Sequence, residues 1–498
     1  MIRSSTGSII LILLLLLASG LLLPVRTAFG TMVEEVRWYE LRIAGEVCGW
    51  TRIRESDDAL GRRTIEEEVS LRLRRAGRET LVRTSHRETI GADGRLASMS
   101  RIDRQGGREV ETTWSFSQDA VQERRITGER IETRSCPPAS DDCVHASGLL
   151  RRAAEDLAVG EEMTFQVIGP AGGCEPVPRR LVSLPASDEH PGHRRWEIEE
   201  PEAPATIVVA DEAGRIVRAR TTLGPGLGDL EMIGVDRVDD TVIAGAGFDL
   251  DGRGALVPRI ASAVGRPDRG TSLCMRLHVA EGTLPQLFDA GVQKVLPDES
   301  GLIVSVDLEH RTPFEGDSER WLARTDSLEI DDPEIVRFAS RAVPSGASDR
   351  ITAWRLRRAV HRHIRDKSHR IGFTTAGQTV RAREGDCTEH ALLLAAALRV
   401  HGVPSRLVSG LIWTPASDPD RGEFVWHMWV QAAIDGGWCD LDPTLDESTR
   451  RHPAYIAVAV SDGTEGDARR ERAAILELFG RGLEIDVVGR GVEEGHHP

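Results

Sequence analysis

Hydrophobic and polar residues alternate with a period of two over much of residues 34–242. Residues 69–73 (VSLRL) and 110–116 (VETTWSF) are two clear examples. This period places every second side chain on the same face of a strand, so one face of the sheet is buried. Turn-forming runs such as DEAG at 211–214 separate the alternating segments. The pattern predicts long antiparallel hairpins in a meander, interrupted by a short helix at about 147–157.

Helical patterns take over near residue 330. Asp332 followed by Pro333 is an N-cap with proline in the first helical position. A second helix is predicted from Asp349, because apolar residues recur at spacings of three and four and form one buried stripe. They are Ala353, Leu356, Val360 and Ile364. The change of period predicts the α+β class, with a β-rich antiparallel domain before a mixed C-terminal domain.

The first 30 residues have the features of an export signal. Arg3 gives a positive start, residues 9–23 form an apolar run, and residues 28–30 (AFG) are a small-x-small cleavage site. The apolar run is shorter than the roughly 20 residues of a membrane-spanning helix. We therefore expect a periplasmic or extracellular protein, with an uncleaved anchor at residues 9–23 as the alternative.

Five segments are predicted from these patterns. Residues 1–30 are the signal or anchor, and 31–245 are the β-rich domain. Residues 246–325 are a linker with a small β-containing segment, 326–462 hold the mixed domain, and 463–498 are a C-terminal helix and tail.

Charge and cysteine content restrict the partners and the covalent links. The formal charge is -16, and an acidic surface repels phosphate backbones, so nucleic acid is not an expected partner. Among the seven cysteines, Cys136 and Cys143 enclose six residues and could close a small loop in an oxidising compartment. The sequence identifies no partner for the other five.

Two weak metal patterns are better explained without a metal. Asp249, Asp251 and Gly252 are similar to the start of a calcium loop, but the remaining oxygen ligands and the closing glutamate are missing. His361 and His363 are two residues apart and cannot share a helical face. We therefore expect no metal and no cofactor.

The clearest chemical signal begins with GDCTEH at 385–390. Asp386 is a good N-cap, Glu389 can complete a capping box, and Gly402 suits the end of the helix. Cys387 is then the first helical residue, at an exposed tip. The unpaired N–H groups and the positive end of the helix dipole favour its thiolate and can hold an oxyanion. A small buried cysteine is the alternative.

A hairpin downstream supplies two partners for this thiol. The turn DGG at 435–437 centres the hairpin near residue 436, so Asp442 falls opposite about Trp429 and diagonal to His427. A slip of one residue would move Asp442 to the other face. With this register Cys387, His427 and Asp442 form a Cys-His-Asp triad, in which they act as nucleophile, base and orienting carboxylate.

The spaced motifs of this region resemble the transglutaminase-like superfamily of papain-fold thiol enzymes. They are G-x-C at 385–387, G-V-P-S-R at 402–406, H-M-W at 427–429 and W-C-D-L-D-P-T at 438–444. The resemblance covers about residues 325–460 and implies the same three roles for Cys387, His427 and Asp442. It also implies a second oxyanion donor, for which Gln378 is a candidate.

The resemblance implies an exported acyl-transfer enzyme that attacks a protein or peptide amide. The acyl group would pass to an amine, as in a transglutaminase, or to water, as in a protease or amidase. Contact with a membrane is expected only through an uncleaved N-terminal segment. The alternative is a catalytically inert periplasmic scaffold that binds a partner through its β-rich domain.

Overall fold

The computed structural model describes residues 34–491, apart from short segments. The segments outside the description are 76–77, 106–107, 128–129, 141–142, 170–173, 202, 212–213, 224–227, 239–246, 250–258, 261–265, 280–283, 285, 300, 316–317, 367–374, 416–421 and 446–451; between 465 and 482 only 467, 470, 471, 474 and 478 are described. The predicted export signal, residues 1–30, lies outside the described residues. Within the described part, no helix is both long enough and apolar enough to cross a membrane.

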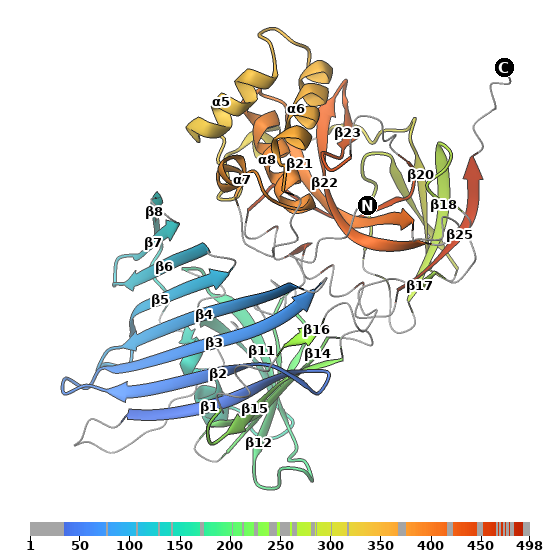
Figure 1. The fold of residues 1–498 in the computed structure, drawn as a ribbon. Coiled ribbons are helices and arrows are strands. Elements are labelled where there is room, and N and C mark those ends of the chain that lie inside the picture. Colours follow the sequence, from blue (N-terminus) through green and yellow to red (C-terminus); the bar gives the residue numbers. More distant parts are fainter. Residues whose placement is uncertain are drawn as a thin grey trace, which may run out of the picture. The chain divides into compact units, whose positions relative to one another are not determined.

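The described residues form two compact units, one between 34 and 249 and one between 259 and 491. The first unit is a single large sheet that runs up and down in chain order (Figure 1). Its strands are β1 (Glu34–Ile43), β2 (Glu46–Asp57), β3 (Arg63–Arg75), β4 (Arg78–Ile90), β5 (Leu96–Gln105), β6 (Arg108–Phe116), β7 (Val121–Thr127), β8 (Arg130–Cys136), β9 (Val144–His145), β10 (Glu162–Ile168), β11 (Val177–Leu184), β12 (Arg194–Glu199), β13 (Thr206–Ala210), β14 (Ile216–Thr222) and β15 (Asp229–Val235).

The connections of this sheet confirm the predicted meander. Consecutive strands from β1 to β8 and from β10 to β15 pair antiparallel, and β1 also pairs with β15. The predicted short helix is α2 (Leu149–Asp156), which follows a 3-10 turn at Ala146–Gly148. The short strand β16 (Phe248–Asp249) pairs with β3, so this sheet continues past the boundary at 245 that the sequence predicted.

The disulfide of this unit differs from the one that the sequence suggested. Cys136, at the end of β8, is bonded to Cys174, whereas Cys143 is a thiol. The two bonded residues lie 38 positions apart in the chain. Proximity in sequence favoured Cys143, but the fold brings Cys174 within a Cα–Cα distance of 6.2 Å of Cys136. Cys136 and Cys174 share a buried apolar cluster with Met99, Trp114 and Val121.

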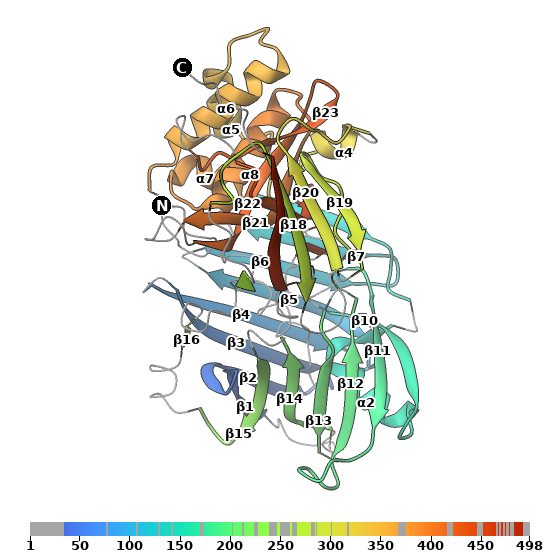
Figure 2. The same ribbon diagram turned by 90° about the vertical axis from the view of Figure 1, so that its right-hand side faces the viewer.

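The second unit contains a five-stranded sheet, whose strands stand side by side in Figure 2. In spatial order its strands are β17 (Arg259–Ile260), β25 (Leu483–Gly491), β18 (Ser272–Val279), β20 (Gly301–Asp307) and β19 (Gln293–Asp298). The prediction of a helix and tail for 463–498 is therefore wrong at its end. Residues 483–491 form the inner strand β25, which lies between β17 and β18 and pairs antiparallel with β18.

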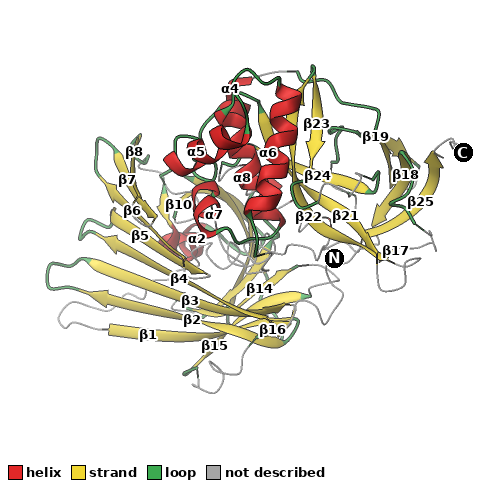
Figure 3. Cartoon of the chain, turned by 45° about the horizontal axis from the view of Figure 1, so that its top comes forward, coloured by secondary structure: helices red, strands yellow, loops and turns green. Residues whose placement is uncertain are grey.

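The helices and a four-stranded sheet form the rest of the second unit (Figure 3). The helices are α4 (Ser318–Leu322), α5 (Pro333–Ala342), α6 (Asp349–His363), α7 (Ala376–Ala382) and α8 (Cys387–Val400). The sheet has the spatial order β23 (Gly437–Leu441), β22 (Gly422–Ile434), β21 (Ser405–Pro415) and β24 (Tyr455–Ser461). Asp332 caps α5 as predicted. The helix α6 begins at Asp349 as predicted, and its N-cap is Ser348.

The strand β22 separates two apolar cores. Met428 and Val430 pack in the core that the helices form, whereas Val425 and Trp429 pack on the other face with Tyr455. This division follows the alternation of side chains along a strand. α8 is the innermost helix, since it packs against α5, α6, α7 and β22.

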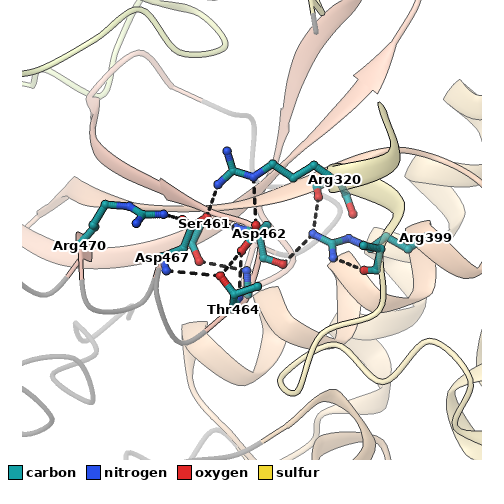
Figure 4. A network of polar contacts seen from close by, with 10 residues as sticks. Arg320, Arg399, Ser461, Asp462, Thr464, Asp467 and Arg470 are labelled. Carbon is teal, nitrogen blue, oxygen red and sulfur yellow. Dashed lines mark hydrogen bonds and ion pairs between the residues drawn. The ribbon is translucent and has the colours of Figure 1, made fainter. Parts of the chain in front are cut away.

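A polar network fixes the segment that follows β24 (Figure 4). Arg320 donates from Nε to Asp462 and from Nη2 to Asp467, at 3.0 and 2.6 Å. Burial opposes ionisation of Asp462, but hydrogen bonds from Thr464 and Arg320 lower its pKa to about 2. Arg399, near the end of α8, donates to the backbone carbonyl of Asp462 at 2.9 Å. The network therefore links α4, α8 and the end of the sheet.

Candidate active site

Cys387 is the first residue of α8, and its backbone is set by a capping box. The carboxylate of Asp386 accepts from the N–H of Thr388 at 2.9 Å, and the N–H of Asp386 donates to Glu389 at 2.8 Å. Gly385 has a φ of +155°, and a Cβ there would lie 2.3 Å from the Cβ of Glu389. The glycine of G-x-C is therefore required by both backbone conformation and space.

Cys387 is buried, which corrects the expectation of an exposed helix tip. Its side chain is 6% exposed. The helix α8 is buried on nearly every side, from Glu389 to Arg399. The backbone N–H of Met428 on β22 points at the sulfur, with an N to Sγ distance of 3.3 Å. This donor favours a negative charge on the sulfur.

The predicted hairpin register is confirmed. Asp435 and Gly436 have φ values of +53° and +79°, which fits a two-residue turn of type I′. Val430 is paired with Leu441. The next residue, Asp442, therefore lies opposite Trp429, on the face of the sheet that also carries His427. His427 Nε2 lies 2.8 Å from Oδ2 of Asp442. A carboxylate can only accept, so Nε2 is the donor.

Asp442 accepts hydrogen bonds from more residues than Thr444 of its own motif and His427. Its Oδ1 accepts from the N–H and the hydroxyl of Thr444, at 2.9 and 2.6 Å. Its Oδ2 accepts from the hydroxyl of Tyr455 at 2.8 Å as well as from His427. Its backbone carbonyl accepts from Nε of Arg357 on α6 at 2.8 Å. Sequence reasoning missed Tyr455 and Arg357, because no local pattern connects them to Asp442.

The charges of the three residues support one another. Burial disfavours protonation of His427, but the charge of Asp442, followed by that of Cys387, raises the pKa of His427 to about 10. Burial likewise disfavours ionisation of Asp442, but His427 and the Thr444 hydrogen bonds hold its pKa well below its usual range. Because Asp442 occupies Nε2, Nδ1 is the ring nitrogen left to interact with Cys387. The charge of Asp442 therefore favours the imidazolium form of His427.

Other residues singled out from the sequence have structural roles. The side-chain carbonyl of Gln378 accepts from the N–H of Thr375 at 3.3 Å and completes the capping box of α7. The buried His390 is hydrogen-bonded through Nδ1 to the carbonyl of Asp386 at 2.6 Å. Cys439 lies on β23 opposite Ala432.

The two weak metal patterns gain no support. His361 Nδ1 is 3.1 Å from the carbonyl of Pro443, and His363 Nε2 is 2.7 Å from that of Val380. Asp251 and Gly252 lie outside the described residues. In the part of the chain that the structure describes, no three His, Cys, Asp or Glu side chains are grouped so that they could hold a metal.

Curated relatives match part of this chain. An uncharacterized protein of Mycobacterium tuberculosis (strain ATCC 25618 / H37Rv) is 32% identical over 150 residues, which are 28% of this chain and 47% of that protein. An uncharacterized protein of Mycobacterium bovis matches with the same values. The chain thus spans about half the length of the curated relatives it matches.

Solved structures match at low identity. The periplasmic domain of TgpA from Pseudomonas aeruginosa is 17% identical, with a TM-score of 0.28, over 38% of this chain and 75% of that chain. A protein of Domain of Unknown Function DUF1849 from Brucella abortus is 12% identical, with a TM-score of 0.31, over 43% of this chain and 100% of that chain.

The family comparison addresses the region of the candidate site itself. Residues 337–443 match the model of the transglutaminase-like superfamily. The match runs from α5 to the residue after Asp442, and so contains Cys387, His427 and Asp442. It confirms the resemblance inferred from the spaced motifs, and the part of the chain that carries these three residues is a transglutaminase-like domain.

Proposed function

We propose that this chain is an exported cysteine-dependent acyl-transfer enzyme that acts on protein or peptide amides. The observation that supports it most is the connected arrangement of Cys387, His427 and Asp442, which come from α8, β22 and the end of β23. A thiol beside an imidazole that a carboxylate orients is the arrangement needed for nucleophilic catalysis.

In the first half-reaction the thiolate of Cys387 attacks the carbonyl carbon of the amide. A C–S bond forms while the carbonyl π electrons move to oxygen, and the backbone N–H of Cys387 at the start of α8 is suited to hold that oxyanion. The C–N bond then breaks as the oxyanion collapses. His427 gives its proton to the departing amine, and Asp442 keeps the ring oriented for that transfer.

In the second half-reaction an amine or water attacks the thioester. His427 accepts a proton from this nucleophile, the C–S bond breaks, and Cys387 leaves as a thiolate. The product is a new amide if an amine attacks and a carboxylic acid if water attacks. The two outcomes use the same residues and differ in how well the site excludes water.

Alkylation of the intact protein tests whether the thiol is activated. Iodoacetamide should modify Cys387 faster than Cys143, Cys274 and Cys439, although those three thiols are only partly buried and Cys387 is buried. The His427→Ala variant should lose this advantage. Equal or slower alkylation of Cys387 in the wild-type protein would contradict the proposal.

Turnover separates an enzyme from an inert scaffold. The protein is incubated with glutamine-containing peptides and with peptide amides, with and without a primary amine. Mass spectrometry then follows the acyl adduct on Cys387 and the products. We expect an adduct in the wild-type protein and none in Cys387→Ala. A folded wild-type protein that forms neither adduct nor product, and whose Cys387 is not activated, would favour the scaffold.

A further inference from the structure

Tyr455 reaches the candidate site from the strand at the opposite edge of the sheet. It begins β24, whereas Asp442 follows β23, and the strands β22 and β21 lie between them. Its backbone is paired with Ile412 of β21. The buried side chain, 4% exposed, packs on the sheet face that Val425 and Trp429 share. From there its hydroxyl donates to Oδ2 of Asp442 at 2.8 Å.

The hydroxyl shares one carboxylate oxygen with the candidate base. Oδ2 of Asp442 accepts from both Tyr455 and His427, while Oδ1 is occupied by Thr444. We propose that Tyr455 is a positioning residue of the Cys-His-Asp triad, which fixes the Asp442 carboxylate and limits how strongly it binds the imidazolium of His427. This inference rests on the proposed function of the same site.

A hydrogen bond from the hydroxyl has two effects on Asp442. It fixes the rotation of the carboxylate, so the oxygen stays in line with Nε2 of His427. It also draws negative charge toward the phenol, which weakens the attraction between this oxygen and the imidazolium. His427 must release a proton to the leaving amine, and an imidazolium that is bound less tightly releases it more readily.

The ring of Tyr455 is held independently of its hydroxyl. Its centroid lies 5.3 Å from that of Trp429, edge to face, and 6.2 Å from that of His427. The indole N–H of Trp429 is itself fixed by Asp440 at 2.7 Å. Phenylalanine should therefore occupy the same space, and Tyr455→Phe removes the hydroxyl alone.

In the described part of the chain, several ionisable groups lie near this pair. Cys387 approaches His427 from α8. Arg357 of α6 bonds the backbone carbonyl of Asp442 rather than its carboxylate. The ring of His452, which precedes β24, lies 5.1 Å from that of Tyr455. The pH response of His427 should thus be compared between proteins that differ only at the Tyr455 hydroxyl.

The chain has two tyrosines, which allows a matched experiment. Tyr39→Phe, in the buried core of the N-terminal unit, is the control. Tyr455→Phe should lower kcat roughly tenfold while KM stays within about twofold, because a charge-assisted hydrogen bond is lost but no substrate contact is. The control should change neither constant. Thermal unfolding of both variants verifies that they fold.

A spectroscopic readout does not depend on turnover. In protein labelled with 15N-histidine, the Nε2–H proton of His427 should resonate at lower field in Tyr455→Phe than in wild type, because its bond to Asp442 strengthens. Replacing the tyrosine of the Tyr39→Phe protein by 3-fluorotyrosine gives a stronger hydroxyl donor at position 455. The resonance should then move the opposite way. Unchanged resonances, or shifts in the same direction, would overturn the inference.

The two readouts separate failure of this inference from failure of the proposed function. Normal turnover in Tyr455→Phe with an unshifted resonance would refute the role of Tyr455 and leave the enzyme intact. Suppose instead that the resonance shifts in opposite directions in the Tyr455→Phe and 3-fluorotyrosine proteins, but the wild-type protein shows no turnover. That result would support the role of Tyr455 in holding Asp442 and refute the proposed enzymatic function.

Discussion

The Nε2–H of His427 points at the Oδ2 of Asp442 across a distance of 2.8 Å, and both side chains are buried. The two residues come from neighbouring strands, and the contact exists because the Asp435–Gly436 turn sets the register of β22 and β23. A slip of this register by one residue would direct Asp442 to the helix side of the sheet.

Asp442→Asn should abolish most of the turnover. The amide keeps the shape of the carboxylate, but it removes the charge that orients and stabilises the imidazolium, so kcat should fall by on the order of 10³–10⁴-fold. Steady-state kinetics measure this loss. The control is Asp435→Asn at the exposed turn, where φ is +53° and asparagine is well tolerated. A comparable loss in the control, or a small loss in Asp442→Asn, would contradict the assignment.

The transglutaminase-like domain should lose stability as the pH rises from neutral toward 10. The pKa of His427 is raised from 6.5 to about 10 in the folded protein. Its stabilising contribution is therefore complete below about pH 6.5 and is lost as pH rises through about 10. Calorimetry of wild type and Asp442→Asn, from about pH 6 to about pH 10, measures this loss of stability. The wild-type Tm should decline more steeply, and parallel curves would contradict the raised pKa.

Gly385→Ala should destabilise the domain and displace the thiol. The added Cβ would lie 2.3 Å from the Cβ of Glu389, and the φ of +155° is unfavourable for alanine. We expect a loss of roughly 2–4 kcal/mol in urea unfolding, with slower alkylation of Cys387. Gly402→Ala is the control, because φ there is +76° but nothing lies within 4 Å of the new Cβ. It should cost about 1 kcal/mol, the penalty for alanine in the left-handed region. Equal effects would show that the contact with Glu389 is unimportant.

Cys174→Ser should destabilise the N-terminal unit, whereas Cys143→Ser should not. The Cys136–Cys174 disulfide closes a loop with a sequence separation of 38, so its loss should cost roughly 2–4 kcal/mol in the unfolding of that unit. Thiol titration of the denatured, unreduced protein should find the five thiols of the structure. Alkylation of Cys387 should be the same in both variants. A larger effect of Cys143→Ser would indicate the pairing that the sequence suggested.

Glu67→Gln should make the N-terminal unit less sensitive to pH. Glu67 on β3 is buried opposite His86 of β4. Burial, followed by the charge of Glu88, raises the pKa of Glu67 from 4.5 to about 8. Its contribution to stability is thus complete below about pH 4.5 and is lost as pH rises through about 8. Urea unfolding across that range should show a flatter dependence in the variant. Glu66→Gln, on the same strand with its side chain 31% exposed, is the matched control.

Local signals predicted much of the candidate site. Asp386 and Glu389 lie three residues apart at the start of an apolar helix, and a capping box needs nothing beyond that spacing. The turn at residues 435–437 fixed the register that brings Asp442 to His427. The period of two along residues 34–242 predicted the meander for the same reason, since alternation is a property of each strand alone.

Local sequence patterns could not predict contacts between segments that lie far apart in the chain. The exposed tip expected for Cys387 was wrong, because β22 approaches the start of α8 and the N–H of Met428 lies against the buried sulfur. The β25 strand was missed, since its pairing partner β18 lies about 200 residues earlier in the chain. The Cys136–Cys174 pairing depends in the same way on how two distant segments meet.

The sequence by itself determined the elements, their caps and turns, and the order in which Cys387, His427 and Asp442 occur. These depend on backbone preferences over a few residues, and such preferences are written in the local sequence. The tertiary structure decided how deeply the thiol is buried and which residues hold the Asp442 carboxylate. Tyr455 and Arg357 meet Asp442 only because the sheet and α6 pack around it, and packing of that kind depends on the whole chain at once.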